Sequence, residues 1–374
     1  MKNLFRKIHY SEPLCGKEKL AALVILPLSV VASLFYGIAV AVRNFLYDKG
    51  LLKSAKLPAY VISIGNLTTG GTGKTPITAE IANRLTAAGR RVAVISRGYG
   101  GKLDINATNI ISDGQTVFHT AEQTGDEPFW IAKNAPGTVV ITGKNRVASG
   151  RLAIEKYNSD VLLVDDGFQH RKLQRDLDIV LIDGARVLGN RLLLPAGALR
   201  EPVSNIKRAD KVIIVNKTGT INDCIPCIQE ELKRKYGIES CVCGFVADKI
   251  YDISTGETAK EISSAVAFAG IAQPESFFSL LEAQGIRLAE KKVFPDHYLY
   301  RKEDVEALIE TAQSTGANSI ITTEKDAVKI QPLISNAPTS QISVYALKLK
   351  VDLCLDLERC LKLNTKEFED KTAG

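Results

Sequence analysis

A run of 23 residues without a charge lies near the start of the chain, from Leu20 to Val42. Basic residues flank it, at Lys2, Arg6, Lys7, Lys17 and Lys19 before it and at Arg43, Lys49, Lys53 and Lys56 after it. About 20 apolar residues can span a bilayer, so the pattern predicts a membrane-associated helix within residues 1–56. Positive charge on both sides leaves a span, a hairpin and a helix in the interface open, with a buried soluble helix as the alternative.

Short, continuously apolar runs follow from residue 57 onward. They cover Tyr60 to Ile64, Val92 to Ile95, Thr138 to Ile141, Val161 to Val164, Ile179 to Ile182 and Val212 to Val215. Strands that are apolar at every position are typical of parallel sheets covered by helices on both faces. Residues 57–240 are therefore predicted to form a doubly wound, mostly parallel α/β domain with its ligands beyond the carboxyl ends of the strands.

A second set of elements begins after residue 240. Strands are predicted at Ala265 to Ile271, from Ser319 onward and at Val344 to Val351, with a helix near Pro274 to Gln284. The strand from Ser319 ends in the polar residues Thr323 to Asp326, whose role the sequence leaves open. Residues 241–374 are thus predicted to form a smaller α/β domain that closes over the active site.

The composition narrows the classes of function. With 374 residues, 45% of them hydrophobic and 24% charged, the chain can build two or three domains with real cores. The net charge of +6 suits an anionic ligand or a membrane surface, and the dense basic clusters of a nucleic-acid-binding protein are missing. Cys224-Ile-Pro-Cys227 with Cys241-Val-Cys243 allows a zinc site, although the short second spacing favours buried thiols.

The first predicted strand runs into a glycine-rich loop, Gly-Asn-Leu-Thr-Thr-Gly-Gly-Thr-Gly-Lys-Thr-Pro, from Gly65 to Pro76. A helical pattern follows, with Ile77, Ile81 and Leu85 on one face. In such a strand, loop and helix, backbone N–H groups surround phosphates, the lysine reaches the terminal phosphates and the last threonine binds Mg²⁺. The segment predicts a nucleoside triphosphate site, with a chance glycine turn as the alternative, since Thr68 stands where the usual pattern has glycine.

Two carboxylates follow directly after another predicted strand. Val161 to Val164 leads into Asp165 and Asp166, and a carboxylate at this place holds or orients Mg²⁺ in P-loop proteins. An Asp-Gly turn is the alternative interpretation. The next loop carries polar and basic residues that can serve phosphates or remain solvated: Gln169, His170, Arg171, Lys172 and Arg175.

Four further loop residues are candidates for chemistry. Arg97 follows a predicted strand and indicates either phosphate recognition or a plain surface loop, and Arg200 by itself is weak evidence. Asp126 lies two residues before Pro128, a pattern that favours a helix N-cap over catalysis. His297, next to Asp296, is more typical of a structural or solvated histidine unless it faces the phosphate site across a cleft.

Together these segments resemble the tetraacyldisaccharide 4'-kinase family, the ATP-dependent lipid A kinases of Gram-negative bacteria. The resemblance covers nearly the whole chain and rests on the apolar N-terminus, the loop at 65–76, Ser96-Arg-Gly-Tyr-Gly, Gly-Asp126-Glu-Pro, Val-Asp165-Asp166-Gly-Phe-Gln-His170, Leu-Arg200-Glu-Pro, Asp296-His297 and Thr323-Glu-Lys-Asp326. The threonine at position 68, where the usual loop has glycine, also resembles the family's sequences. The resemblance implies ATP- and Mg²⁺-dependent phosphorylation of the 4'-hydroxyl of a tetraacyldisaccharide 1-phosphate at the cytoplasmic face of the bacterial inner membrane.

The resemblance also implies roles for single residues. Asp126 would be the general base, paired with His297, and Arg200 would neutralise charge on the transferred phosphoryl group. Thr75, Asp165 and Asp166 would serve Mg²⁺, and Arg97, Tyr99 and His170 would lie near the substrates. The residues expected to bind ATP are Thr68, Thr69, Gly70, Gly71, Thr72, Gly73, Lys74 and Thr75.

Other classes of P-loop protein fit less well. A membrane-tethered GTPase needs Asn-Lys-x-Asp, whereas Asn216-Lys217-Thr218 is followed by Gly219. A partition-type ATPase has a signature lysine where Thr69 stands, and a non-catalytic nucleotide-binding scaffold stays open. We expect a monomer without a nucleic-acid partner, and the sequence does not reveal the acyl-chain preference.

Overall fold

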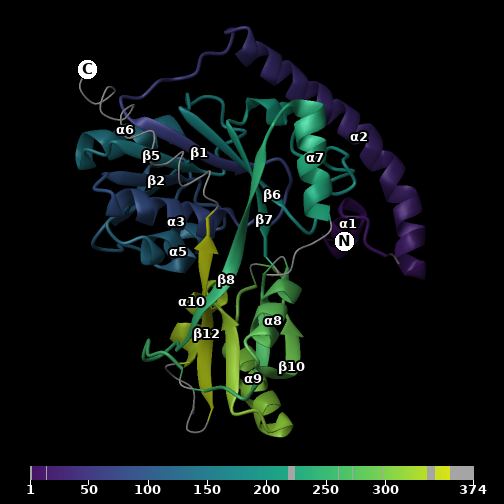
Figure 1. The fold of residues 1–374 in the computed structure, drawn as a ribbon, viewed down its shortest axis with the longest axis vertical. Helices are drawn as coiled ribbons and strands as arrows, with labels where there is room; N and C mark the ends of the chain where they lie inside the picture. The colour runs from purple at the N-terminus through teal and green to yellow at the C-terminus, as the bar shows by residue number, and fades with distance from the viewer. Residues whose placement is uncertain are drawn as a thin grey trace.

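The computed structural model describes residues 2–13, 15–217, 224–259, 261–271, 273–296, 298–334 and 342–353. Its strands form one sheet in the order β10-β9-β11-β12-β8-β7-β6-β1-β5-β2-β4-β3. The sheet passes through a larger and a smaller lobe, with the long strand β8 joining them (Figure 1). The mostly parallel, helix-covered sheet predicted from the apolar runs is confirmed.

The larger lobe contains the strands β1 (Tyr60–Asn66), β2 (Val92–Ser96), β3 (Asn109–Asp113), β4 (Val139–Thr142), β5 (Val161–Asp165), β6 (Leu177–Asp183) and β7 (Lys211–Asn216). They pair in parallel except β3, which lies antiparallel to β4 at the sheet edge. All six apolar runs are strands. The sequence pattern missed β3 because this edge strand is only partly buried.

Helices cover both faces of this sheet. On one face lie α3 (Lys74–Ala87) and α5 (Asp126–Asn134), which follows α4 (Ala121–Thr124); on the other lie α6 (Arg146–Tyr157), the 3-10 helix η1 (Val203–Arg208) and α7 (Cys224–Tyr236). Successive residues of a strand point to opposite faces, so Ile62 packs in the core against α3, whereas Val61 packs in the core that contains α6.

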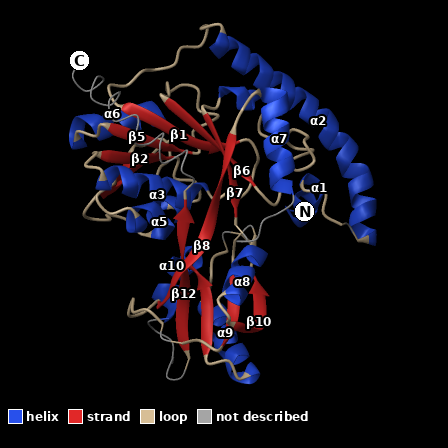
Figure 2. Cartoon of the chain, viewed as in Figure 1, coloured by secondary structure: helices blue, strands red, loops and turns tan. Residues whose placement is uncertain are grey.

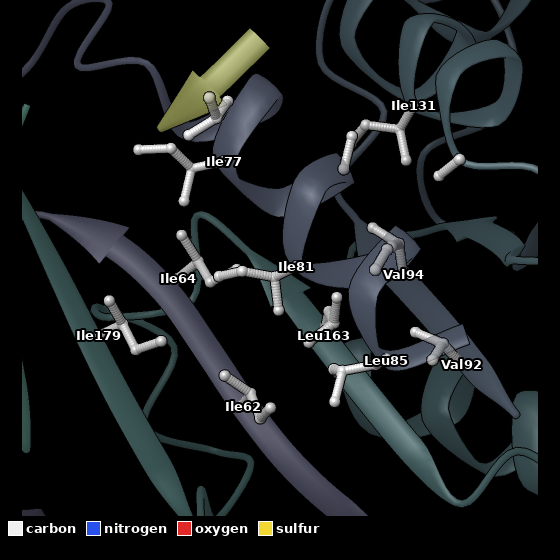
Figure 3. Close-up of a cluster of buried hydrophobic side chains, with 14 of the residues drawn as sticks. Ile62, Ile64, Ile77, Ile81, Leu85, Val92, Val94, Ile131, Leu163 and Ile179 are labelled. Atoms are coloured by element: carbon white, nitrogen blue, oxygen red, sulfur yellow. The ribbon is translucent and has the colours of Figure 1, made fainter. Parts of the chain in front are cut away.

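The core between α3 and the sheet is shown in Figure 3. Ile77, Ile81 and Leu85 of α3 point toward the strands, and each is at most 3% exposed. They meet Ile62 of β1 and Leu163 of β5. The helical face predicted from the sequence is therefore confirmed, and it holds the start of α3 firmly at the end of β1.

The smaller lobe contains β8 (Ser240–Asp252), β9 (Ser264–Ala269), β10 (Arg287–Val293), β11 (Ser319–Thr323) and β12 (Ser343–Asp352), with α8 (Pro274–Ala283), α9 (Lys302–Thr315) and α10 (Glu324–Ile334). The predicted strands and the helix near Pro274 are confirmed. β8 and β10 were missed because most of their positions are partly exposed. Glu324 to Asp326 form the first turn of α10, so their interpretation as the end of a strand is wrong.

Strand β8 connects the lobes by hydrogen-bonded pairing. It pairs in parallel with β7 from Ser240 to Gly244 and antiparallel with β12 from Gly244 to Asp252. Figure 2 shows β8 and β12 extending from the larger lobe into the smaller one. A shared pair of strands restricts the relative orientation of the lobes, and α10 packs against α5 across the junction.

The N-terminal segment forms α1 (Lys2–His9) and α2 (Gly16–Asp48), which lies along the outside of the larger lobe (Figure 1). One side of α2 is buried at Ala22, Ser29, Ser33, Val40 and Asn44. The opposite side exposes large apolar side chains, including Leu20, Leu23, Leu28, Leu34, Phe35 and Ile38. Within the described residues α2 alone is long and apolar enough to cross a membrane by length and composition.

The cysteines only partly follow their prediction. Cys243 is buried, as expected for a thiol that packs as a small apolar residue. Cys224 and Cys227 are exposed at the start of α7, so their interpretation as buried thiols is wrong.

Candidate active site

The carboxyl ends of the central strands open into a cavity of about 1410 Å³ between the two lobes. Typical small-molecule pockets have about 300–1,000 Å³, so a nucleotide and a second ligand fit together. The smaller lobe contributes Gln273, Phe277 and Asp296 to the lining. Tyr36, Arg43 and Tyr47 of α2 also line it, so the apolar helix borders the same space as the glycine-rich loop.

The glycine-rich loop joins β1 to α3, which begins at Lys74. Thr69 to Thr75 line the cavity. Gly70 and Gly73 have φ angles of +108° and +84°, a left-handed conformation that favours glycine. The backbone thus turns toward the positively polarised N-terminus of α3, where anions bind.

Thr68 does not line the cavity. It is buried and pairs its backbone with Leu199, while Thr69 N–H donates to the carbonyl of Ala198. The loop is held from its far side as well, because the ammonium of Lys217 donates to the Gly71 carbonyl and pairs with Asp183 at 2.6 Å. Thr68 therefore supports the loop through its backbone.

Asp165, the last residue of β5, is buried with an unsatisfied oxygen. The Ser96 hydroxyl is 3.5 Å from its Oδ2, and its Oδ1 has no hydrogen-bond partner within the described part of the chain. Burial, followed by repulsion from Glu127, raises the pKa of Asp165 to about 7 despite the attraction of Lys74. A buried carboxylate in this state fits a cation, because a bound cation would supply the missing partner.

Asp166, the next residue, lies in a different environment. Its backbone is left-handed with φ of +53°, which turns the carboxylate toward Arg200 Nη1 at 2.8 Å and Lys74 Nζ at 3.5 Å. Burial acts to raise the pKa of Asp166, but the charges of Lys74 and Arg200 outweigh burial and lower it. Two cations therefore already neutralise Asp166.

Arg200 is positioned by α2 as well as by its own loop. The Tyr36 hydroxyl donates to the Arg200 carbonyl at 2.8 Å, and the Arg200 guanidinium also reaches Gln169 Oε1 at 3.3 Å. The adjacent Glu201 is fully buried and binds Arg43 and Asn44 of α2, each at 3.0 Å. Helix α2 and the segment that carries Arg200 are thus connected directly by hydrogen bonds.

Asp126 is the first residue of α5, and the N-cap position belongs to Gly125. The N-cap interpretation of Asp126 is therefore wrong, although Pro128 does lie in the first turn. A Cβ on Gly125 would collide with the carbonyl of Tyr99, so the loop of Arg97 and Tyr99 packs directly on the start of α5. Asp126 lines the cavity and forms an ion pair with Lys329 of α10 at 3.0 Å.

Arg97, Tyr99 and His170 also line the cavity. Tyr99 is 79% exposed, whereas His170 is half-buried and its Nε2 has no hydrogen-bond partner in the described chain. Burial, together with Arg146 and neighbouring cations, lowers the pKa of His170 to about 4. His170 is therefore a neutral hydrogen-bonding group near pH 7 rather than a cation.

Because His170 is neutral in the folded protein, its contribution to stability changes with pH. Below its ordinary pKa of about 6.5 the unfolded chain takes up a proton that the folded protein refuses until about pH 4. This contribution is complete above pH 6.5 and is lost as the pH falls. The unfolding free energy of wild type should fall between pH 7 and pH 5. In His170→Gln this fall should be smaller by on the order of 1 kcal/mol, allowing for solvent screening.

Urea unfolding of wild type and His170→Gln in detergent at the two pH values measures this difference. His119→Gln, a change of the same type outside the cavity lining, is the matched control. An identical pH dependence in wild type and His170→Gln would contradict the neutral state of the histidine.

The structure brings the described candidate residues together, apart from Thr68, and His297 lies outside the described residues. The sequence pattern missed the lining residues Arg146, Lys217 and Gln273. It also missed Lys329, which pairs with the lining residue Asp126. Arg146 follows β4, so the rule that polar residues after parallel strands face the ligand also applies to it. Lys329 and Gln273 are different, because only the packing of the smaller lobe places them here.

Comparisons with known proteins agree with one another. A family model described as Tetraacyldisaccharide-1-P 4'-kinase matches residues 23–365. A tetraacyldisaccharide 4'-kinase of Geobacter metallireducens is 44% identical over 335 residues, which cover 88% of this chain and 95% of the relative. One of Pelobacter propionicus is 44% identical over 310 residues, covering 82% and 83%.

A solved structure is similar over most of the chain. It is the crystal structure of the "apo" form of LpxK from Aquifex aeolicus in complex with ATP, with a TM-score of 0.69 and 33% sequence identity. The alignment covers 90% of this chain and 97% of that one.

Proposed function

The chain belongs to the tetraacyldisaccharide-1-P 4'-kinase family, and from this premise we propose which side chains carry out its reaction and where it works. The enzyme transfers the γ-phosphate of ATP to the 4'-hydroxyl of a tetraacyldisaccharide 1-phosphate in lipid A biosynthesis, with ATP and Mg²⁺ as cofactors. The observation that carries the proposal is the meeting of the glycine-rich loop, Asp126, Asp165 and Arg200 in one cavity that α2 also lines. Phosphoryl transfer depends on positioning and charge neutralisation, and these groups supply both.

We propose that residues 69–75 hold the phosphates of ATP, with the Lys74 ammonium at the β- and γ-phosphates. Thr75 and Asp165 would hold Mg²⁺, which when bound neutralises phosphate charge. The unsatisfied Oδ1 of Asp165 supports this choice, whereas Asp166 is already neutralised by Lys74 and Arg200. Asp166 then orients these two cations and serves the metal only indirectly.

Arg200 would neutralise the phosphoryl group during transfer. Its guanidinium contacts Asp166 at 2.8 Å, and both residues line the cavity, where an added anion would compete for the guanidinium. A planar fork of N–H donors suits phosphoryl oxygens. Arg97, Tyr99 and His170 would contact the substrates, with the neutral imidazole of His170 as a hydrogen-bonding group.

Asp126 would accept the proton of the attacking sugar hydroxyl. It follows Gly125, the N-cap residue of α5, and its carboxylate lines the cavity and is held by a cation from the opposite lobe. His297 is proposed as its partner by the resemblance of Asp296-His297 to the family, and Asp296 lines the same cavity. A three-part division into residues 1–56, 57–240 and 241–374 fits these roles.

The roles are tested by following label from γ-labelled ATP into tetraacyldisaccharide 1-phosphate in detergent with Mg²⁺. Wild type is compared with single variants of each named side chain whose folding is verified by circular dichroism. Label transfer that survives the loss of Lys74, Asp126 and Arg200 would overturn the assignment of this cavity.

We propose that α2 lies in the surface of the cytoplasmic leaflet of the inner membrane and that the enzyme acts there as a monomer. Buried contacts of Ser29, Ser33 and Asn44 tie α2 to the larger lobe. The remaining stretch from Gly16 to Leu28 extends roughly 20 Å at 1.5 Å per residue, less than the roughly 30 Å hydrocarbon core. An interfacial helix keeps the polar contacts and immerses only its exposed apolar side.

The double variant Leu23→Ser, Leu34→Ser is expected to weaken binding to anionic lipid vesicles by at least about 100-fold, since each buried leucine contributes roughly 1.5–3 kcal/mol. Both side chains are more than 60% exposed, so folding should not change. Vesicle flotation measures binding. Phe118→Ser, Leu299→Ser removes exposed apolar groups elsewhere and is the control. Equal binding by the α2 double variant and this control would contradict an α2 anchor.

A further inference from the structure

The ammonium of Lys329 is buried at the junction of the two lobes. Lys329 lies on α10 of the smaller lobe, and its side chain is 7% exposed. It contacts Asp126 Oδ2 at 3.0 Å, donates to the Tyr298 carbonyl at 3.3 Å and lies 3.8 Å from Asp326 Oδ1. A buried cation needs a carboxylate partner, and the shortest contact is with a residue of the opposite lobe.

Asp326 is the more distant carboxylate of the two, at 3.8 Å through Oδ1, and its Oδ2 is engaged elsewhere. Oδ2 of Asp326 accepts from the Gly270 N–H at 2.9 Å and from the Thr323 hydroxyl at 2.8 Å. The Asp326 N–H in turn donates to the Thr323 hydroxyl at 3.1 Å, which fixes the first turn of α10. The segment Thr323 to Asp326, whose role the sequence left open, thus builds a rigid base that aims Lys329 at Asp126.

The charges around Asp126 make this contact consequential. On its own helix the next residue is Glu127, and α10 contributes Lys329 and the fully buried Asp326. The cavity lining carries many other charged side chains of both signs, among them Lys74, Arg97, Asp296 and Lys325. Lys329 contacts the Asp126 carboxylate directly, at 3.0 Å. Loss of this contact removes a positive charge 3.0 Å from the carboxylate and makes Asp126 easier to protonate.

We propose that Lys329 is a positioning residue for the transfer reaction, which holds the Asp126 carboxylate in place and ionised from the opposite lobe. This inference rests on the proposed role of Asp126 as the general base. A protonated carboxylate cannot accept the proton of the sugar hydroxyl, and a misplaced one accepts it slowly. Because the cation comes from α10, the base is set in place only when the lobes are packed together.

The test is a double-mutant cycle measured by label transfer in detergent with the full chain. Lys329→Met is expected to lower kcat by about 10- to 100-fold, as for a misplaced catalytic group, with KM for ATP nearly unchanged. The acid limb of the pH profile of kcat/KM should move to higher pH by roughly one unit or more, and Lys329→Arg should restore its position. In an Asp126→Asn background, Lys329→Met should cause no further loss of kcat.

Lys302→Met removes an exposed lysine of the same lobe, paired with Glu306, and is the matched control. An unmoved acid limb, or an equally large loss in the Asp126→Asn background, would show that Lys329 is merely structural and overturn the proposal. If Lys329→Met does not fold, Lys329→Gln removes the charge as well, and the same changes in kcat and in the acid limb are expected for it. Full activity of Asp126→Asn alone would instead refute the proposed base, so the two failures are distinguishable.

Discussion

Asp126→Asn is expected to lower kcat for lipid phosphorylation by about 10²–10⁴-fold, the usual contribution of a general base. Asparagine keeps the shape of the side chain but cannot accept the proton of the sugar hydroxyl. Asp126 lies away from the glycine-rich loop in sequence, and the N-cap position of its helix belongs to Gly125. ATP affinity should therefore change little, whereas the free energy of unfolding should fall, because buried Lys329 loses its nearest carboxylate partner. Single-turnover transfer of label and equilibrium binding of ATP measure the two effects separately.

Glu122→Gln is a suitable control for this variant. Glu122 is a carboxylate on the preceding helix α4, paired with Lys102 at the exposed surface and outside the cavity lining. It should retain wild-type kcat, because exposed ion pairs contribute little. An Asp126→Asn protein that folds normally and transfers phosphate at the wild-type rate would leave Asp126 with a structural role.

Arg200→Ala is expected to lower kcat by about 10³–10⁵-fold, the range for an arginine that stabilises charge in phosphoryl transfer. The guanidinium is already fixed beside the cavity by Asp166 and Gln169, so little reorganisation is needed when the phosphoryl group moves. Arg200→Lys should recover only part of the rate, because an ammonium lacks the planar fork of donors. Steady-state label transfer at saturating ATP measures both variants.

Arg191→Ala is the matched control for the loss of an arginine. Arg191 lies in the same connection between β6 and η1 but pairs with Glu231 at the surface, away from the cavity. Its removal should leave kcat unchanged. A reduction of kcat by less than tenfold in Arg200→Ala would assign Arg200 to the structural connection with α2 instead.

The sequence predicted the larger lobe well because its strands are buried on both faces. Continuous apolar runs such as Val161 to Val164 leave little alternative to a covered parallel strand. β8 escaped detection because its positions are mostly intermediate or exposed, and this strand joins the two lobes. Where a strand is partly solvated, its pairing depends on neighbours distant in sequence, here β7 and β12.

Candidate site residues could be predicted where they follow a strand of the doubly wound sheet. Asp165 and Arg97 were found in this way, and Arg146 meets the same criterion. Asp126 was interpreted as a cap from local chemistry, because an aspartate before Glu-Pro suits a helix start. The structure shows Gly125 at the cap position, a choice that depends on the close packing of the Tyr99 loop.

By itself the sequence determined the parallel sheet, the phosphate-binding loop and the uncharged N-terminal helix, because each is encoded in contiguous residues by hydrophobic periodicity or fixed spacing. The tertiary structure alone decided which oxygen of the Asp165-Asp166 pair lacks a partner, how α2 holds Arg200 through Tyr36, and that Lys329 faces Asp126. These features join residues far apart in the chain. Their energies depend on burial and on distances of a few ångströms between charges, which only the packing of the lobes sets.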